Sequence, residues 1–555
     1  MRKALLSLIL TFALSSIAIC QSIMDVPATD NDGNPIVNSL IKYVVADTND
    51  AGQQKHDIYK LELGKVYYYN QSAVFKNPVT LVADDPGTTE ETKPPKILVT
   101  QDDQGNVPEE AVITTFANLT CKNIAFSTIT ADNQYSWGNA IVLQKDNLRI
   151  ELDKCYFELI GWAFIEADGI NHTTLIVRGC ETRNGSPFGG DEWVPFFFEG
   201  SGGSVDTCIA TNNTFFNIQG SVFNIEPLTP WKYIYFDHNT CVNVVQNFTT
   251  DIAAHLNTTI TNNIFYNAGC YGSIINDLTA SGGDHVQPGL IEIDTLAPNS
   301  AGGGDLPPIM AEKDRILKVE NNVYFWSQGV HDYWAAYADS VARIPWLSSR
   351  GEHMVSDKTT WPNFTFANNV EADPGFTNFG GTDEMIAQMY NDRNIQQFGF
   401  WGWDPDSVTY PDIHWAFMQW PLPEDFSYSA EFTSTDGYHV GSLQWYPDEL
   451  AKYEEGLVGV KDGKNVPVQF SLEQNYPNPF NPTTTVDFNL SRTGEVNLAV
   501  YNMIGQRVMT VINNQAMSSG SHTVNINMSH QASGIYFLVL KQNANVKVIK
   551  MTLLK

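Results

Sequence analysis

The chain has 555 residues, a formal net charge of −30 and an aromatic content of 12%. This apolar and aromatic bulk can form a large core and argues against wholesale disorder, and the length allows two to four domains. The acidic surface excludes nucleic acid as a partner, because phosphates would be repelled across most of it. The charge is also uneven: residues 21–466 carry a net charge of −35, and residues 467–555 carry +3.

The N-terminus has the features of a secretory signal. Two basic residues precede an apolar run, Ala4–Ile19, that is too short to span a membrane. The small residues at its end predict cleavage before Gln21, so residues 1–20 are interpreted as a signal peptide. A lipoprotein anchor on Cys20 is the alternative, which the bulky residue before it disfavours. The sequence therefore predicts an exported protein.

A short pattern recurs along the middle of the chain at steps of 24–34 residues. It consists of a strand-like run, then Asn-Asn or an equivalent pair, then an aromatic residue or a cysteine, as in Asn212–Phe216 and Asn262–Tyr266. Units of this size cannot bury an apolar face alone, but they can when stacked into a solenoid. Asn suits such turns, and stacked Asn side chains can hydrogen-bond along the column.

This pattern resembles the right-handed parallel β-helix proteins of the pectin-lyase-like superfamily over roughly residues 55–380. The resemblance implies an all-β fold, with a β-helix and its N-terminal cap over residues 21–380. An insertion is expected at 277–315, and an aromatic-rich C-terminal flank at 381–452. The superfamily contains polysaccharide lyases, glycoside hydrolases, epimerases, adhesins and inert fibres. Whether the protein is an enzyme therefore stays open; if it is, a polysaccharide hydrolase or lyase is expected.

The six cysteines of the mature chain all lie between residues 121 and 270. Cys155 and Cys180 hold the same position in adjacent repeats. Because free cysteines are usually buried, a small apolar ladder is favoured over a catalytic thiol. A disulfide between the two is the alternative that export would permit.

The C-terminal residues form a separate module after a polar linker at 453–466. Short alternating strands with regular turn signals predict a small Ig-like β-sandwich over residues 467–555. Its opening segment Gln474–Pro482 and its ending Lys550–Lys555 resemble the type A sorting domain of the type IX secretion system. The resemblance implies a Gram-negative bacterium, the type IX secretion machinery as a partner, and a secreted or outer-membrane surface location.

Candidate catalytic residues come from a column of carboxylates, because no linear catalytic motif is present. Strand-like runs end at Glu166, Glu199 and Glu226, each after an apolar residue, so alternation places the three carboxylates on the outer face. Adjacent rungs about 5 Å apart and alternate rungs about 10 Å apart resemble the carboxylate separations of glycosidases. Asp251 and Asp277 could extend the column as ligands of Ca²⁺, the one candidate cofactor. A solvated acidic face is the alternative.

Histidine–aspartate pairs are further candidates for acid–base chemistry. Asp237–His238 lies beside the turn column, which favours hydrogen bonding within the turn, and His331–Asp332 lies farther along the chain. A third pair, Asp284–His285, lies in the insertion, where it could wall a binding face.

Nine of the thirteen tryptophans lie between residues 325 and 446. Exposed aromatic faces suit stacking on sugar rings, so Trp401, Trp403 and Trp193 are candidate substrate-binding residues. Packing as a cap on the solenoid is the alternative, and the two roles can coexist. The sequence favours a protein that acts on or binds extracellular polysaccharide, neutral or bridged by cations. A non-catalytic surface, adhesion or structural protein is the competing hypothesis.

Overall fold

The structure, a computed structural model, describes residues 22–458 and 471–554 apart from short segments. The segments left out of these ranges are 88, 110, 132–135, 137, 186–195, 201, 219, 225–230, 246–248, 251–254, 275–288, 292, 294–310, 339–340, 377–381, 396–433, 435, 473–474, 476, 491–493, 504–505, 518–519 and 543–544. The chain forms two compact units, the first ending at Tyr446 and the second beginning at Pro447. No helix in the described ranges is long and apolar enough to cross a membrane.

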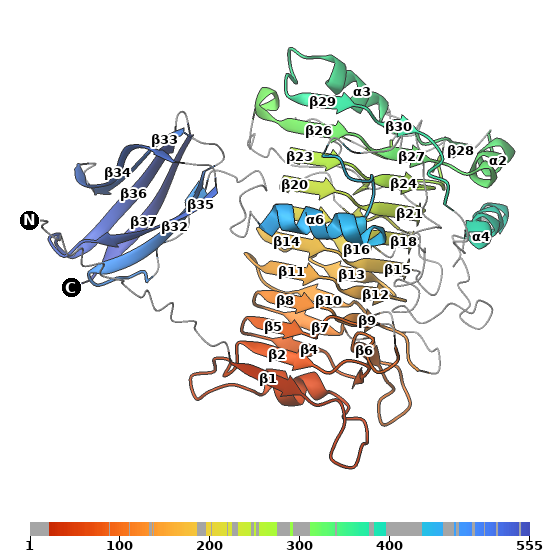
Figure 1. The fold of residues 1–555 in the computed structure, drawn as a ribbon, viewed down its shortest axis with the longest axis horizontal. Helices are drawn as coiled ribbons and strands as arrows, with labels where there is room; N and C mark the ends of the chain where they lie inside the picture. Colours follow the sequence, from red (N-terminus) through yellow and green to blue (C-terminus); the bar gives the residue numbers. More distant parts are fainter. Residues whose placement is uncertain are drawn as a thin grey trace, which may run out of the picture. The chain divides into compact units, whose positions relative to one another are not determined.

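The first unit is a parallel β-helix, which confirms the predicted fold class (Figure 1). Among the described residues its strands form three parallel sheets, of eleven, ten and seven strands. Strands that follow one another along the chain belong to the three sheets in turn, so a complete coil contributes one strand to each sheet. One such coil consists of β11 (Arg149–Asp153), β12 (Tyr156–Glu158) and β13 (Ala163–Glu166).

Each sheet keeps the order of the chain from one edge to the other, as expected when coils contact only their neighbours. The eleven-stranded sheet contains β1 (Ile23–Val26), β2 (Ile58–Leu61), β5 (Val79–Val82), β8 (Leu119–Lys122), β11, β14 (Thr173–Arg178), β17 (Val205–Thr211), β20 (Trp231–Asp237), β23 (His255–Thr261), β26 (Ile316–Glu320) and β29 (Phe364–Ala367). The ten-stranded sheet contains β3 (Val66–Tyr69), β6 (Lys96–Val99), β9 (Ala125–Ser127), β12, β15 (Glu181–Gly185), β18 (Thr214–Ile218), β21 (Thr240–Val244), β24 (Ile264–Tyr266), β27 (Val323–Phe325) and β30 (Val370–Glu371). The seven-stranded sheet contains β4 (Ala73–Phe75), β7 (Ile113–Thr115), β10 (Ile141–Leu143), β13, β16 (Phe196–Glu199), β19 (Phe223–Asn224) and β22 (Thr249–Thr250).

Asparagine side chains stack in the turn between the eleven-stranded and ten-stranded sheets. Asn239 Oδ1 accepts from the Asn213 backbone N–H at 2.9 Å, and Asn239 Nδ2 donates to Asn263 Oδ1 at 3.1 Å. The residue before each of these has a left-handed backbone, for example Asn262 with a φ of 58°. The predicted asparagine ladder is confirmed, and its members are Asn213, Asn239, Asn263, Asn322 and Asn369.

A second asparagine ladder, which the sequence pattern did not reveal, follows the ten-stranded sheet. Asn243 Nδ2 donates to Asn217 Oδ1 at 2.9 Å, and Asn267 Nδ2 donates to Asn243 Oδ1 at 3.2 Å. These residues are themselves left-handed and buried. Both corners of the ten-stranded sheet are therefore fixed by amide side chains, and the ladder consists of Asn184, Asn217, Asn243 and Asn267.

The cysteines of the mature chain are buried in the β-helix and free. Cys155 and Cys180 occupy equivalent turn positions on adjacent coils, and the Cys155 backbone N–H donates to Cys180 Sγ at 3.4 Å. The expected buried ladder is therefore confirmed, and the two thiols form no disulfide.

Helices pack against the last coils of the β-helix (Figure 1). They are α2 (Gln328–Ala336), α3 (Ser349–Ser356) and α4 (Thr382–Ile395). Short elements elsewhere in the unit are η1 (Ile41–Val45), η2 (Glu312–Asp314), η3 (Leu443–Trp445), and the antiparallel pair β25 (Ser273–Ile274) and β28 (Val341–Ala342). The predicted insertion at 277–315 is described only at 289–291, 293 and 311–315, and residues 1–20 lie outside the described ranges.

A segment far along the chain binds the outside of the first asparagine turn. Residues 436–446, here called the strap, follow the turn residues of successive coils. The Gly441 backbone N–H donates to Asn262 O at 2.7 Å, and Leu443 N–H donates to Asn212 Oδ1 at 3.1 Å. Trp445 of the strap is buried against Ala125 and Tyr156 of the ten-stranded sheet. The strap therefore covers part of the outer face of that sheet.

The second unit is a small antiparallel β-structure with its own apolar core. One sheet orders its strands β31-β32-β35 and the other β34-β33-β36-β37, consistent with the predicted sandwich. The unit begins with α6 (Pro447–Val458), so the first residues of the predicted linker 453–466 are helical. Its strands are β31 (Ser471–Leu472), β32 (Thr483–Leu490), β33 (Gly494–Asn502), β34 (Arg507–Met517), β35 (Gly520–Asn527), β36 (Gly534–Gln542) and β37 (Asn545–Leu553).

Candidate functional site

The predicted carboxylate column begins as expected on the seven-stranded sheet. Strands β13 and β16 pair in parallel, with Glu166 opposite Glu199. The preceding residues, Ile165 and Phe198, are buried in the core, so the alternation expected from the sequence holds on these two rungs. Glu166 is half-buried and accepts a hydrogen bond from Asn139 Nδ2 of the neighbouring coil.

The third predicted member of the column, Glu226, lies outside the described residues, so its place in the column stays a prediction. On the next strand Asn224 lies opposite Glu199, because β19 pairs through Phe223 and Asn224. Thr250 then lies opposite Asn224. Among the described residues, the backbone register therefore places Glu166 opposite Glu199 on this face. Two further predicted site residues, Asp251 and Asp277, also lie outside the described residues.

The predicted sugar-stacking residues Trp193, Trp401 and Trp403 also lie outside the described residues. Within the described part of the aromatic-rich segment, the tryptophans are between 1% and 7% exposed. Trp445 packs on the outer face of the ten-stranded sheet, and the other four belong to apolar clusters toward the C-terminal end of the solenoid, as expected of a cap: Trp326, Trp334, Trp346 and Trp361. Two of these rings nevertheless line a cleft.

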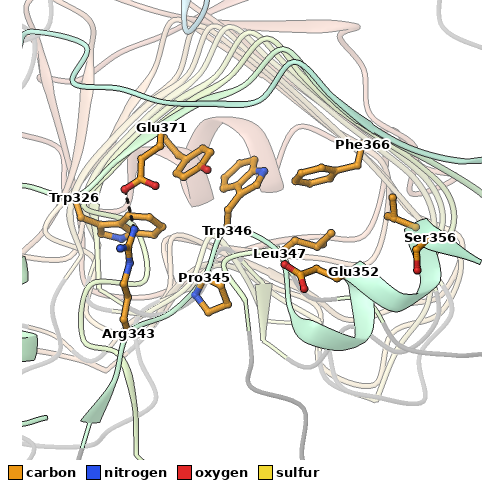
Figure 2. Close-up of a pocket in the computed structure, with 11 residues that line it drawn as sticks. Trp326, Arg343, Pro345, Trp346, Leu347, Glu352, Ser356, Phe366 and Glu371 are labelled. Atoms are coloured by element: carbon orange, nitrogen blue, oxygen red, sulfur yellow. Dashed lines mark hydrogen bonds and ion pairs between the residues drawn. The ribbon is translucent and has the colours of Figure 1, made fainter.

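The cleft lies at the C-terminal end of the coil stack and has a volume of about 650 Å³ (Figure 2). Its apolar part is built by Tyr324 from β27, Trp346 from the segment before α3, and Phe366 from β29. The Tyr324 and Trp346 rings are stacked, with centroids 4.6 Å apart and planes 2° from parallel. Tyr324 and Phe366 are both partly exposed, so the cleft presents aromatic surface to solvent.

One end of the cleft carries an ion pair. Arg343 donates to Glu371 Oε1 at 2.8 Å, and its guanidinium lies 4.9 Å from the centroid of the Trp326 ring. Cation–π contact and ion pairing together orient this arginine. Burial, followed by the nearby charge of Glu371, raises the pKa of Tyr324, so its hydroxyl stays protonated at neutral pH. Glu352 and Ser356 of α3 supply polar groups on the other side of the aromatic rings (Figure 2).

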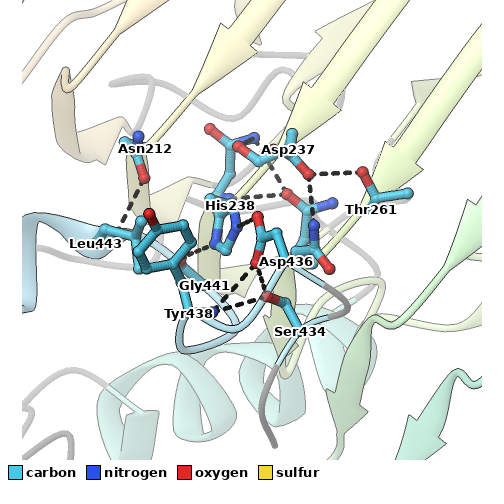
Figure 3. Close-up of polar contacts among 12 residues, drawn as sticks. Asn212, Asp237, His238, Thr261, Ser434, Asp436, Tyr438, Gly441 and Leu443 are labelled. Carbon is cyan, nitrogen blue, oxygen red and sulfur yellow. Dashed lines mark hydrogen bonds and ion pairs between the residues drawn. The ribbon is translucent and has the colours of Figure 1, made fainter. Parts of the chain in front are cut away.

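The Asp237–His238 pair holds the strap (Figure 3). His238 is buried, and its ring nitrogens lie 2.9 Å from Asp436 Oδ2 and 3.2 Å from Gly441 O, both strap residues. Asp237 Oδ1 accepts from Thr261 Oγ1 at 2.6 Å and from Asn262 Nδ2 at 2.9 Å. Hydrogen bonding around the turn was the favoured interpretation, and the geometry is consistent with it.

The second histidine–aspartate pair lies on a helix and makes only local contacts. His331 and Asp332 lie on α2, where the His331 ring contacts Trp334 at 5.5 Å and Asp332 accepts from Gln328 at 2.8 Å. Asp284 and His285 lie outside the described residues. In the part of the chain that the structure describes, no group of three His, Cys, Asp or Glu side chains could hold a metal ion.

A buried charged cluster on the ten-stranded sheet escaped the sequence analysis. Arg183 Nε donates to Glu158 Oε1 at 2.6 Å, and Glu181 Oε2 is buried without a hydrogen-bond partner. The residues Glu158, Glu181 and Arg183 are at most 5% exposed. Glu181 and Arg183 are alternate residues of β15, and charged residues at alternate positions are typical of a solvated face, so the sequence pattern gave no sign that they are buried.

Comparison with known families identifies the C-terminal module. Residues 474–554 match the family model of the secretion system C-terminal sorting domain. The resemblance to the type IX sorting domain is thereby confirmed. It indicates a protein exported to the cell surface or the extracellular space through interaction with the type IX secretion machinery. A search of curated proteins gave no match to the chain.

Proposed function

We propose that this protein, exported by the type IX secretion system, binds extracellular polysaccharide in the cleft at the C-terminal end of its β-helix. The observation that carries the proposal is the aromatic lining, in which Tyr324, Trp346 and Phe366 stand between polar groups on either side. Sugar rings present apolar C–H faces and polar edges, so stacked aromatic surface flanked by hydrogen-bonding groups complements them.

The charge of the protein favours a neutral glycan. Residues 21–466 carry a net charge of −35, and Glu352 and Glu371 both line the cleft. An anionic polysaccharide would be repelled unless a cation such as Ca²⁺ bridged it to these carboxylates. Arg343 would do little to attract an anionic polysaccharide, because its positive charge is already paired with Glu371.

Binding is tested by titrating a panel of neutral and anionic polysaccharides into the full mature chain by calorimetry. We expect Phe366→Ala to weaken the binding of the preferred glycan about tenfold, because it removes a stacking ring. Phe116→Ala is the matched control, since Phe116 is 37% exposed and does not line the cleft. Equal loss of affinity in both variants, or no binding to any glycan, would overturn the proposal.

A catalytic role is the finer hypothesis, and it rests on the seven-stranded sheet. Glu166 and Glu199 stand opposite each other on paired strands, which lie about 4.8 Å apart. That spacing is close to the separation of the acid and the nucleophile in retaining glycosidases, about 5–5.5 Å. A hydrolase of the retaining type is therefore the enzyme that this arrangement favours over a lyase, which would also need a basic proton acceptor.

Activity is tested on the same panel by measuring new reducing ends and the absorbance of unsaturated products. If the protein is a hydrolase, Glu199→Gln and Glu166→Gln should each reduce the rate at least about a hundredfold. Neither variant should change binding in the aromatic cleft. Binding without any product across the panel would instead favour the competing function, a non-catalytic surface or adhesion protein.

A further inference from the structure

Three sulfur atoms converge beneath α4, outside the cleft and the carboxylate column. Cys270 Sγ lies 3.7 Å from Met385 Sδ and 3.7 Å from Met389 Sδ. All three side chains are at most 1% exposed. They belong to one apolar cluster with aromatic residues that include Trp326 and Tyr333.

The fold brings these sulfurs together from distant parts of the chain. Met385 and Met389 are four residues apart on α4, so they lie on the same side of the helix. Thr382 at the start of α4 exchanges hydrogen bonds with Asn243 of the second asparagine ladder. Cys270 follows Asn267 of the same ladder, and Gly269 N–H donates to Val244 O at 2.8 Å. One rigid column of turns therefore positions both the thiol and the helix.

We propose that Cys270, Met385 and Met389 form a binding site for Cu(I). One thiol and two thioethers are a soft ligand set, which prefers Cu(I) to hard or borderline divalent ions. Three sulfurs that share a metal at about 2.3 Å stand about 4 Å apart in a trigonal arrangement. The two sulfur–sulfur distances of 3.7 Å need to widen only slightly to accept the ion.

The balance of charge suits an apolar pocket. Cu(I) bound by one thiolate and two neutral thioethers has no net charge, so the complex avoids the cost of burying an ion. Binding releases the proton of the Cys270 thiol to solvent. Burial raises the pKa of this thiol, which keeps it protonated and unreactive until the metal arrives. The Val245 carbonyl oxygen lies 4.0 Å from Cys270 Sγ, farther away than the two thioether sulfurs, and a hard oxygen is a poorer ligand for Cu(I) than sulfur.

The test uses the full mature chain under anaerobic, reducing conditions, with Cu(I) added in competition with the chromophoric chelator bicinchoninate. We expect one Cu(I) per folded chain to be withdrawn from the chelator. The double variant Met385→Leu/Met389→Leu should bind Cu(I) at least about a hundredfold more weakly, because Leu preserves volume and helix propensity but has no sulfur. Met354→Leu is the matched control, since Met354 is also fully buried but lies in the main core.

Two further measurements keep the result decisive. X-ray absorption at the copper edge should show about three sulfur neighbours of the copper in the wild-type chain. Ag(I), a soft monovalent ion that resists oxidation, should raise the thermal unfolding midpoint of the wild-type chain. Near-ultraviolet circular dichroism checks that the variants are folded, and the single variant Met389→Leu replaces the double one if that unfolds. The proposal is wrong if the wild-type chain leaves all copper on the chelator, or if the Leu variants still bind one Cu(I) per chain as tightly as the wild type.

Discussion

Glu181 is a carboxyl group whose burial costs free energy when it is ionised. Its Oε2 atom has no hydrogen-bond partner, and its side chain is 5% exposed. Burial raises its pKa well above the usual value, and the charge of Arg183, two residues along β15, only partly opposes the shift. Arg183 is already paired with Glu158 on the neighbouring strand. Glu181 therefore favours the neutral, protonated form in the native state.

This shift makes a prediction at residue scale. Because the folded pKa of Glu181 is raised, its contribution to stability is complete below the unfolded pKa of about 4.3 and is lost as pH rises through the folded pKa. Glu181→Gln mimics the neutral acid, so we expect it to be about 2 kcal/mol more stable than wild type at pH 8 and no more stable at pH 4. Urea unfolding at the two pH values measures this, and a difference independent of pH would contradict it.

At the scale of elements, one buried histidine, His238, holds the strap by hydrogen bonds. Burial by itself lowers the pKa of His238, but the charge of Asp237 and the hydrogen bond to Asp436 together raise it above its ordinary value. Burial by itself raises the pKa of Asp436, but the hydrogen bond and the charge of His238, with backbone hydrogen bonds, together lower the pKa of that carboxyl. The Tyr438 ring packs 6.4 Å from the His238 ring. A protonated histidine between two aspartates thus joins the strap to the coils.

The pH dependence of the strap follows from these two shifts. The stability that protonated His238 contributes is complete below about pH 6.5 and is lost as pH rises through its raised pKa. The stability that ionised Asp436 contributes is complete above about pH 4 and is lost as pH falls through its lowered pKa. Asp436→Asn should therefore destabilise the β-helix most between pH 4 and 6.5. We expect about 1–2 kcal/mol, because Asp436 is 35% exposed and is partly screened. An equal effect at pH 9, measured by urea unfolding, would exclude this clamp.

The asparagine ladder makes a prediction of its own. The Asn239 side chain accepts from Asn213 and donates to Asn263, and it is fully buried. Asn239→Ala leaves several buried backbone and amide groups without partners, so we expect a loss of about 3 kcal/mol or more in the free energy of unfolding. Val370→Ala, at a position 43% exposed on β30, should cost less than about 1 kcal/mol. Similar losses in both variants would show that the ladder contributes no special stability.

The two units of the molecule have separate apolar cores, and the sorting-domain match lies in the second unit. A chain that lacks residues 459–555 should keep the thermal unfolding midpoint of the β-helix, because no residue of its core is removed. In cells with a type IX secretion system, this truncated chain should accumulate in the periplasm while the full chain reaches the surface or the medium. Cell fractionation and calorimetry measure the two outcomes. Export of the truncated chain would contradict the role of the C-terminal module.

Short-range patterns in the sequence determined the solenoid, the first asparagine ladder, the buried cysteines and the sorting module. Each depends on residues a few positions apart or on one coil repeating the next, so periodicity alone exposes it. The pattern also placed Glu166 and Glu199 on one face. Periodicity could not predict that Asn224 lies opposite Glu199, because the register of β19 depends on how the whole strand pairs and a shift of two residues preserves alternation.

Only the tertiary structure decided where distant segments meet. The cleft joins β27, β29 and α3, the strap packs on Ala125 and Tyr156 of the ten-stranded sheet, and α4 brings two thioethers to Cys270. The contacts of the strap and of the thioethers join residues between about 115 and 320 positions apart, with no repeat to mark them. The pairing of His238 depends on the strap that covers its turn, and the residues of the turn alone cannot specify which distant segment binds there.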